Sequence, residues 1–290
     1  MPSYLRQIRR RVAGALDDLS VHVVTGASST TVTATTLSDG TSVSSVNRYD
    51  GAWVYSPTPA SQQRRVRTGG LNPMTGTLTV DVPWTAPFVG TEIEITRLMP
   101  SAGSALEATD YNSCINRAAS KLLIYDRVTI PITTADTYPL TSQPWLDRPE
   151  RLLRVLEPPA TGTRPIEASW RSPKLVWSGG YPSLELDAPF DFASGNLTLE
   201  VMRPCDSWIG GERAPGTGMT TDPESCLAPL EDIALLALME VLYVLMQRSP
   251  GRPGQWEVRY SEAKERAEAL YFFDGAFYRP KATAPQVAVA

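Results

Sequence analysis

Histidine and cysteine are scarce in this 290-residue chain, and their scarcity excludes the common metal and disulfide sites. The one histidine, His22, has no second histidine and no clustered cysteine near it, so no site for a first-row transition metal is predicted. Cys114, Cys205 and Cys226 lie far apart and lack CxxC spacing, which fits neither a disulfide framework nor a zinc site. We expect three buried or half-buried free thiols in a reducing compartment.

The chain also lacks an excess of positive charge and a long apolar run. It carries 27 basic and 31 acidic residues, a net charge of −4, which argues against a dedicated nucleic-acid-binding protein. The N-terminus has no apolar segment of the kind found in secretion signals. The longest apolar run, Ile233–Met246, is too short to span a bilayer and contains Glu240. We therefore expect a buried helix there and no membrane partner.

Catalytic motifs are missing as well. No G-x-S-x-G turn is present to expose a nucleophile. The glycine-rich stretch Gly210–Met219 lacks the residue order of a phosphate-binding loop. Glu231 and Asp232 lie in the first turn of a predicted helix, where the helix dipole favours negative charge. We predict that the protein is not an enzyme and holds no cofactor and no metal.

The N-terminal segment has the pattern of an amphipathic helix, which we predict over Ser3–Leu19. Arg9, Arg10 and Arg11 fall mostly outside its apolar face. They form either a solvated basic surface or a contact with an acidic partner surface or with DNA. The apolar face consists of Leu5, Ile8, Val12, Ala15, Leu16 and Leu19.

Residues 21–98 read as a series of short strands separated by glycine-containing turns. Stretches such as "GTLTVDV" and "TEIEITRL" are rich in Thr, Val and Ile and partly alternate in polarity. Five or six such strands predict a small all-β barrel or sandwich. Residues 1–100 are accordingly predicted to form an N-terminal helix and a small β module.

The rest of the chain alternates between helical and β patterns. The fold class predicted for the whole is α+β, in which residues 101–274 form a helical bundle interrupted by an antiparallel β lobe at about 129–204. Residues 275–290 contain Pro280 and Pro285 and no periodicity, so we expect an extended C-terminal tail. The predicted helices of the bundle are Thr109–Tyr125, Pro229–Arg248 and Gln255–Phe273.

This order of elements resembles the head–tail connectors of tailed bacteriophages, which are portal adaptor or neck proteins. The stretches that carry the resemblance are "EATDYNSCINRAASKLLIYDRV", the insert Thr129–Pro204, and "APLEDIALLALMEVLYVLMQ" with "YSEAKERAEAL". Together they cover roughly residues 105–290. The N-terminal β module is similar to small modules of virion structural proteins and is not part of the minimal adaptor.

The resemblance implies a structural role in the virion neck, without enzymatic activity or cofactor, after assembly in the host cytoplasm. Such proteins form a ring, typically twelve-fold, below the portal protein. The ring continues the DNA channel, through which the genomic DNA passes without sequence-specific contact, and gives the tail or the next neck protein a docking surface.

Two groups of residues are predicted to make these contacts. In the family, C-terminal tails lie in grooves between portal subunits. The predicted portal-docking residues are therefore Phe277, Tyr278, Arg279, Lys281, Val287 and Val289, and the possible DNA or partner contacts are Arg9, Arg10 and Arg11.

Two other functions remain open. A baseplate or tail-fibre component would use the β modules to bind host glycans, and it predicts trimers with a surface row of aromatic side chains. A cell-wall hydrolase built on carboxylates is the third hypothesis, and it lacks a visible catalytic constellation.

Overall fold

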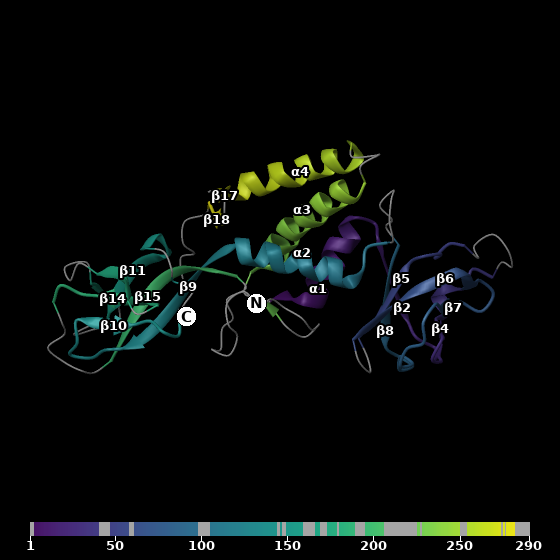
Figure 1. Cartoon of the computed structure of the whole chain (residues 1–290), viewed down its shortest axis with the longest axis horizontal. Helices are drawn as coiled ribbons and strands as arrows, with labels where there is room; N and C mark the ends of the chain where they lie inside the picture. Colours follow the sequence, from purple (N-terminus) through teal and green to yellow (C-terminus); the bar gives the residue numbers. More distant parts are fainter. Residues whose placement is uncertain are drawn as a thin grey trace. The chain divides into compact units, whose positions relative to one another are not determined.

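The computed structural model divides the chain into two compact units, which we describe separately (Figure 1). The first unit contains Met1–Ala118, Met219–Ser225 and Pro229–Ala269, and the second contains Ala119–Gly218, Cys226–Ala228 and Leu270–Ala290. The structure describes residues 3–40, 47–57, 61–97, 105–143, 146, 149–158, 166–168, 173–178, 180–188, 195–205, 225–226, 228–249, 254–273, 275 and 277–281.

Helices of the first unit pack through their apolar faces. Helix α3 is apolar on several sides and packs against α1. Ion pairs add to this packing at the surface: Arg248 binds Asp110 at 2.7 Å, and Arg117 binds Glu240 at 3.1 Å. The helices are α1 (Leu5–Ala15), α2 (Ala108–Lys121, whose last three residues belong to the second unit), α3 (Leu230–Arg248) and α4 (Gly254–Leu270).

A seven-stranded antiparallel sheet in the order β2-β8-β5-β6-β7-β4-β3 forms the rest of the first unit. Its two outer strands are consecutive in the chain, and only Val24 and Thr25 separate them. The Val24 amide donates to the Thr91 carbonyl on the β8 side, and the Thr25 amide donates to the Thr33 carbonyl on the β4 side. The sheet therefore closes on itself as a small barrel, one of the two forms predicted. The strands are β2 (Leu19–Val23), β3 (Gly26–Ala27), β4 (Thr31–Thr33), β5 (Trp53–Ser56), β6 (Gln62–Asn72), β7 (Thr77–Val80) and β8 (Glu92–Thr96), and a 3₁₀ turn, η1 (Thr35–Leu37), follows β4.

Alternating side chains fill the barrel. In β7, Leu78 and Val80 are buried while the threonines between them are half-buried. Gly76 precedes β7 at φ +65°, and a Cβ there would lie 2.2 Å from the Ala34 carbonyl oxygen, so a side chain cannot be accommodated. The barrel core consists of Val24, Val32, Ala34, Leu37, Tyr49, Ala52, Val54, Val66, Leu71, Leu78, Val80, Trp84, Ile93 and Ile95.

The second unit contains two antiparallel sheets that share one core. The first sheet has the order β12-β11-β15-β9 and the second the order β10-β14-β13. Leu197 and Val155 from the first sheet and Leu184 and Tyr138 from the second belong to the same buried cluster, as in a β-sandwich. The strands are β9 (Leu123–Pro131), β10 (Thr137–Pro139), β11 (Leu152–Glu157), β12 (Ile166–Glu167), β13 (Lys174–Ser178), β14 (Tyr181–Glu185) and β15 (Asn196–Pro204), and a 3₁₀ turn, η2 (Pro149–Arg151), precedes β11.

A short hairpin follows α4 and belongs to the second unit. Strand β17 (Tyr271–Phe273) pairs with β18 (Tyr278–Pro280), and Tyr278 also forms a parallel bridge with Leu122. Part of the predicted extended tail is therefore a β-strand. Two further short strands, β1 (Ser3–Tyr4) and β16 (Ser225–Cys226), complete the described elements.

The predicted fold class, a helical bundle with an inserted β lobe, is wrong. The protein is β-rich, with 39% strand, four α-helices in its described part and several antiparallel sheets, one of seven strands. Apolar periodicity identified the helices correctly but could not show what they pack against. The two compact units are not continuous in sequence, because Met1–Ala118 group with Pro229–Ala269 and the hairpin from Leu270 onward groups with the sandwich.

The three cysteines have the environment that the sequence predicts. Cys114, Cys205 and Cys226 are buried and form no disulfide, as predicted. Within the described ranges, no helix is both long and apolar enough to cross a membrane, and no cluster of His, Cys, Asp or Glu side chains is arranged to hold a metal ion.

Candidate functional site

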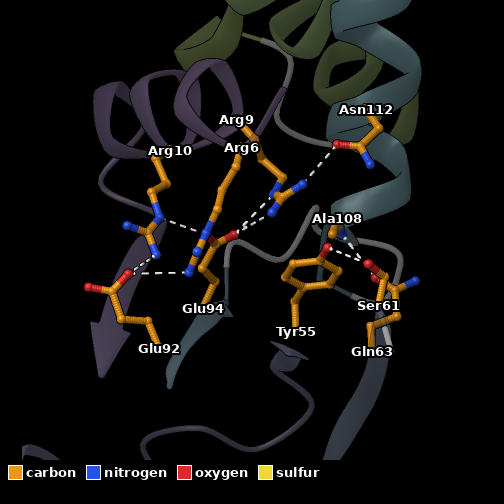
Figure 2. A network of polar contacts seen from close by, with 10 residues as sticks. All are labelled: Arg6, Arg9, Arg10, Tyr55, Ser61, Gln63, Glu92, Glu94, Ala108 and Asn112. Carbon is orange, nitrogen blue, oxygen red and sulfur yellow. Dashed lines mark hydrogen bonds and ion pairs between the residues drawn. The ribbon is translucent and has the colours of Figure 1, made fainter. Parts of the chain in front are cut away.

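Three arginines of α1 converge on one buried carboxylate of the barrel (Figure 2). Glu94 of β8 accepts hydrogen bonds from Arg9 at 2.8 Å, Arg10 at 2.6 Å and Arg6 at 3.0 Å. The side chains of Arg9 and Glu94 are each only 2% exposed. A buried pair of this kind is tolerated only where the charges are matched and hydrogen-bonded.

The spacing of these residues follows from the two elements that carry them. Arg6, Arg9 and Arg10 lie at i, i+3 and i+4 on α1 and so share one helix face. Glu92 and Glu94 alternate along β8 and so point to the same side of the sheet. Arg6 and Arg10 also bind Glu92, at 3.2 and 2.7 Å. We call these five residues the arginine–glutamate network.

Arg9 extends the network to a third element. Its guanidinium lies 4.4 Å from the centre of the Tyr55 ring on β5 and donates to the Asn112 side-chain oxygen on α2 at 3.2 Å (Figure 2). Gln63 of β6 contacts the start of the same helix, because its side-chain oxygen accepts a hydrogen bond from the Ala108 amide. The network therefore attaches α1 and α2 to the outer face of the barrel.

Electrostatics keeps both glutamates ionised. Burial alone would raise the pKa of Glu94, but the charge of Arg9 and the hydrogen bonds from the three guanidinium groups hold it below its ordinary value. The pKa of Glu92 is lowered chiefly by the hydrogen bond from Arg10. A carboxylate held in this way exchanges no proton near neutral pH, so the network is suited to stabilising the fold and unsuited to general acid–base chemistry.

The structure places the predicted contact residues of α1 in ion pairs within the first unit. Arg9 is buried, and Arg10 is bound by two carboxylates, so neither presents a free guanidinium to DNA. Arg11 is exposed but pairs with Glu231 of α3 at 2.9 Å. The cause is the E-x-E pattern of β8, which matches the R-x-x-R-R pattern of α1 and is the sequence signal that could have identified these pairs.

Two of the predicted portal-docking residues have partners inside the second unit. The Tyr278 ring stacks on Phe273 with 4.7 Å between centres and meets Tyr271 edge-on at 6.3 Å. The Phe277 ring lies 4.8 Å from the guanidinium carbon of Arg151. Both rings therefore already have contacts within the second unit. Val287 and Val289 lie outside the described residues.

The same hairpin exposes a group of large apolar side chains. Leu270, Phe272 and Phe273 are 52%, 58% and 53% exposed, three of four consecutive residues. Two cations accompany them: Lys281, whose ammonium lies 5.3 Å from the centre of the Phe272 ring, and the exposed Arg279. Successive residues of β17 point to opposite faces, so Phe272 and its cross-strand neighbour Arg279 lie on one face of the hairpin and Phe273 lies on the other. We call these five residues the hairpin patch, which therefore covers both faces of the hairpin.

The helix predicted over Gln255–Phe273 is too long at its C-terminal end. Leu270, Phe272 and Phe273 were assigned to the last turns of a helix ending at Phe273, whereas α4 ends at Leu270 and β17 begins at Tyr271. The signal that could have found the hairpin is the Asp-Gly pair between two aromatic runs in "YFFDGAFY", a common hairpin turn sequence. Gly275 of this pair has a φ of +89°.

The barrel carries a second, smaller apolar group at a turn. Phe88 and Val89 are 57% and 67% exposed in the connection between β7 and β8. The turn is closed by hydrogen bonds from the Thr91 amide and hydroxyl to the Phe88 carbonyl, and Gly90 supplies the positive φ. The turn presents both side chains to solvent.

Comparison with known proteins found no counterpart. No family model matches the sequence, and no curated protein and no solved structure is significantly similar to it.

Proposed function

We propose that the protein is a structural component of a tailed-phage virion, a head-to-tail adaptor that docks through the hairpin patch. The observation that carries the proposal is the exposure of Leu270, Phe272 and Phe273 on one short hairpin. Aromatic and aliphatic side chains of this size are enriched in the buried centres of protein interfaces. Burying one of them against a partner contributes about 1.5–3 kcal/mol.

The hairpin suits docking because its backbone is already ordered. Pairing of β17 with β18 fixes the exposed rings, so a partner does not have to order them. Arg279 and Lys281 add positive charge beside the rings and would select acidic groups on the partner and set its orientation. We assign the portal protein as this partner, in agreement with the family resemblance of the sequence.

The remaining parts of the proposal follow from the same resemblance. The chain forms a ring, twelve-fold by analogy, below the portal, continues the DNA channel and presents a surface to the tail or to the next neck protein. Its location is the neck of the virion. This proposal does not need a helical bundle at the centre of the fold, because the docking surface lies on a β-hairpin.

A paired substitution tests the docking surface. Leu270→Ser with Phe272→Ser should prevent the chain from co-sedimenting with capsids that carry the portal protein encoded by the same genome. The matched control is Tyr243→Ser with Val258→Ser, two residues of α3 and α4 that are 50% and 60% exposed outside the hairpin patch. Both double variants should melt close to the wild type, because each replaced side chain is at least half exposed. Normal attachment by the hairpin variant would refute the proposal.

The glycan-binding alternative has less support from the sandwich. Trp177 and Tyr181 are both exposed near the turn between β13 and β14. Their register pairs Trp177 with Pro182 and Ser178 with Tyr181. Neighbouring register positions send side chains to opposite faces, so the two rings do not form one stacking platform. We do not propose glycan binding as a second function.

A further inference from the structure

One side of the barrel is built from sequence without charged residues. Residues 19–38, 68–80 and 82–91 contain no Asp, Glu, Lys or Arg, although 20% of the residues of the chain are charged. These ranges supply three neighbouring strands, β7, β4 and β3, together with the turns around them. The helices are attached elsewhere, because the arginine–glutamate network and Gln63 hold them to β8, β5 and the start of β6.

Hydroxyl groups line the outer face of these strands. Val32 and Leu78 belong to the barrel core, so the threonines on either side of each point outward. The register pairs these threonines across β4 and β7, and one row continues onto β6 and β3. We call the outward residues the neutral face, and they are Thr31, Thr33, Thr77 and Thr79, with Asn72 of β6 and Gly26 of β3.

The hydroxyl groups of the neutral face can bind a copy of themselves. The hydroxyl oxygens of Thr33 and Thr77 lie 2.9 Å apart, so one donates a hydrogen bond to the other. A hydroxyl group has one donor and two acceptor positions, and a single bond does not saturate it. Two identical rows of hydroxyl groups can therefore pair with each other, whereas two identical rows of like charge would repel.

Exposed apolar side chains lie at the ends of the same strands. Met74 precedes β7 and Val82 follows it, and they are 57% and 55% exposed. The turn with the exposed Phe88 and Val89 is hydrogen-bonded to Val24, which lies two residues before β3. The buried centres of protein interfaces are depleted of charge and enriched in Met and aromatic side chains. This side of the barrel therefore has the composition of a surface that is covered by protein.

We infer that two copies of this chain associate through the neutral face about a two-fold axis. In such a contact both copies present the same patch, so the patch has to be complementary to itself. Charged groups orient a different partner and exclude wrong ones. A face without charge carries no such selection, and its hydroxyl groups supply both donors and acceptors, so a second copy is the partner that fits it.

This contact goes beyond the proposed docking function. Contacts that close a cyclic ring join two different patches, whereas a two-fold contact joins a patch to itself. The neutral face belongs to the first unit and the hairpin patch to the second. Pairing through the neutral face is a property of the free protein and is measured without capsids, so each proposal fails in its own experiment.

Sedimentation of the full chain over a range of concentrations tests the pairing. The neutral face has no large apolar side chain at its centre, so the pair should be weak, with a dissociation constant of about 0.1–1 mM. The protein should be monomeric at micromolar concentration. Its average mass should rise from 31.7 kDa toward twice that value as the concentration approaches the dissociation constant.

Opposite charges on the two copies make the test specific. Thr31→Lys with Thr79→Lys, or Thr31→Glu with Thr79→Glu, should weaken association at least about tenfold, because a two-fold contact brings like charges together. An equimolar mixture of the two variants should regain association, since Lys of one copy then meets Glu of the other. The matched control carries the same changes at Thr129 and Thr198, a cross-strand pair of the sandwich, and should associate like the wild type.

Two further measurements separate loss of association from loss of folding. Circular dichroism melting shows whether each variant folds. Methyl NMR of the wild type needs no substitution on the neutral face. The threonine methyl signals of the neutral face should shift as the concentration rises, whereas those of Thr129 and Thr198 should stay constant.

Four results would overturn the inference. The first is a mass that stays at the monomer value up to about 1 mM, the upper end of the expected range. The second is equal weakening in the control variants, which would show a general effect of added charge. The third is a mixture of folded Lys and Glu variants that regains no association. The fourth is a set of neutral-face methyl signals that do not change with concentration.

Discussion

At the scale of single residues, Glu94 is the group on which the first unit depends. It is buried with three arginines around it, and one of them, Arg9, is also buried. Removing a carboxylate from such a site leaves a buried positive charge without compensation. The free-energy penalty of this uncompensated buried charge is larger than the stabilisation that the lost hydrogen bonds had contributed.

Replacing Glu94 should therefore be far more harmful than replacing its neighbour on the same strand face. We expect Glu94→Ala to lower the free energy of unfolding by about 3–5 kcal/mol, since it breaks a buried pair. Glu92→Ala should cost about 0–1 kcal/mol, because the Glu92 side chain is 44% exposed. Urea unfolding of both variants measures the difference. Equal losses would show that the network contributes no more than a surface ion pair.

His22 gives the barrel a pH dependence. Burial, helped by the charge of Arg48, lowers its pKa below the ordinary value of 6.5, so the folded barrel favours the neutral ring. The unfolded chain binds the proton more readily, so the stability that His22 contributes is present above pH 6.5 and is lost as the pH falls below it. The wild type should lose more thermal stability between pH 7.5 and 5.5 than His22→Gln. An equal loss of thermal stability in the wild type and in His22→Gln would contradict this account.

At the scale of elements, the sequence predicted the secondary structure better than the packing. The helix expected over Pro229–Arg248 is α3 at Leu230–Arg248, and the strand expected at Glu92–Thr96 is β8. Periodicity of apolar residues is a local property, so such elements can be found by inspection. The N-terminal helix ends at Ala15 instead of Leu19, because Asp17 adopts a positive φ and Leu19 begins β2.

Pairing between distant elements was the part that sequence reasoning could not supply. Arg9 and Glu94 are 85 residues apart. Nothing in the helical pattern around Arg9 or in the strand pattern around Glu94 indicates that the two residues form a pair. The hairpin patch was missed for a related reason. The apolar residues up to Phe273 continue the composition of α4, and only the Asp-Gly pair marks the change to a strand. The helical bundle was predicted because helices were assumed to pack only on one another.

The hairpin also changes what truncation should do. Arg279 and Pro280 pair with β17, and the Lys281 amide donates to the Leu270 carbonyl, so residues 279–281 are part of the second unit. A chain that ends at Lys281 should keep the melting temperature of the full chain. A chain that ends at Phe277 should melt lower, because it loses β18 and uncovers Tyr271, which is 3% exposed. Calorimetry compares the two, and identical melting would show that β18 adds no stability.

At the scale of the whole molecule, the chain combines a barrel with helices and a sandwich with a hairpin, each with its own core. No coiled-coil heptads force the copies together. We expect the free protein to be monomeric or weakly associating at micromolar concentration, with ring contacts forming on a portal template by effective concentration. Analytical ultracentrifugation checks this expectation. A stable dodecamer without portal would contradict it.

The central claim is that the hairpin patch docks the protein to a portal ring. Cryo-electron microscopy of the full chain bound to capsids that carry the portal protein of the same genome tests it most directly. The account predicts a ring of copies below the portal, in which Leu270, Phe272 and Phe273 are buried against portal subunits. A bound ring that leaves the hairpin patch in solvent, or capsids with no density for the chain at the portal, would contradict it.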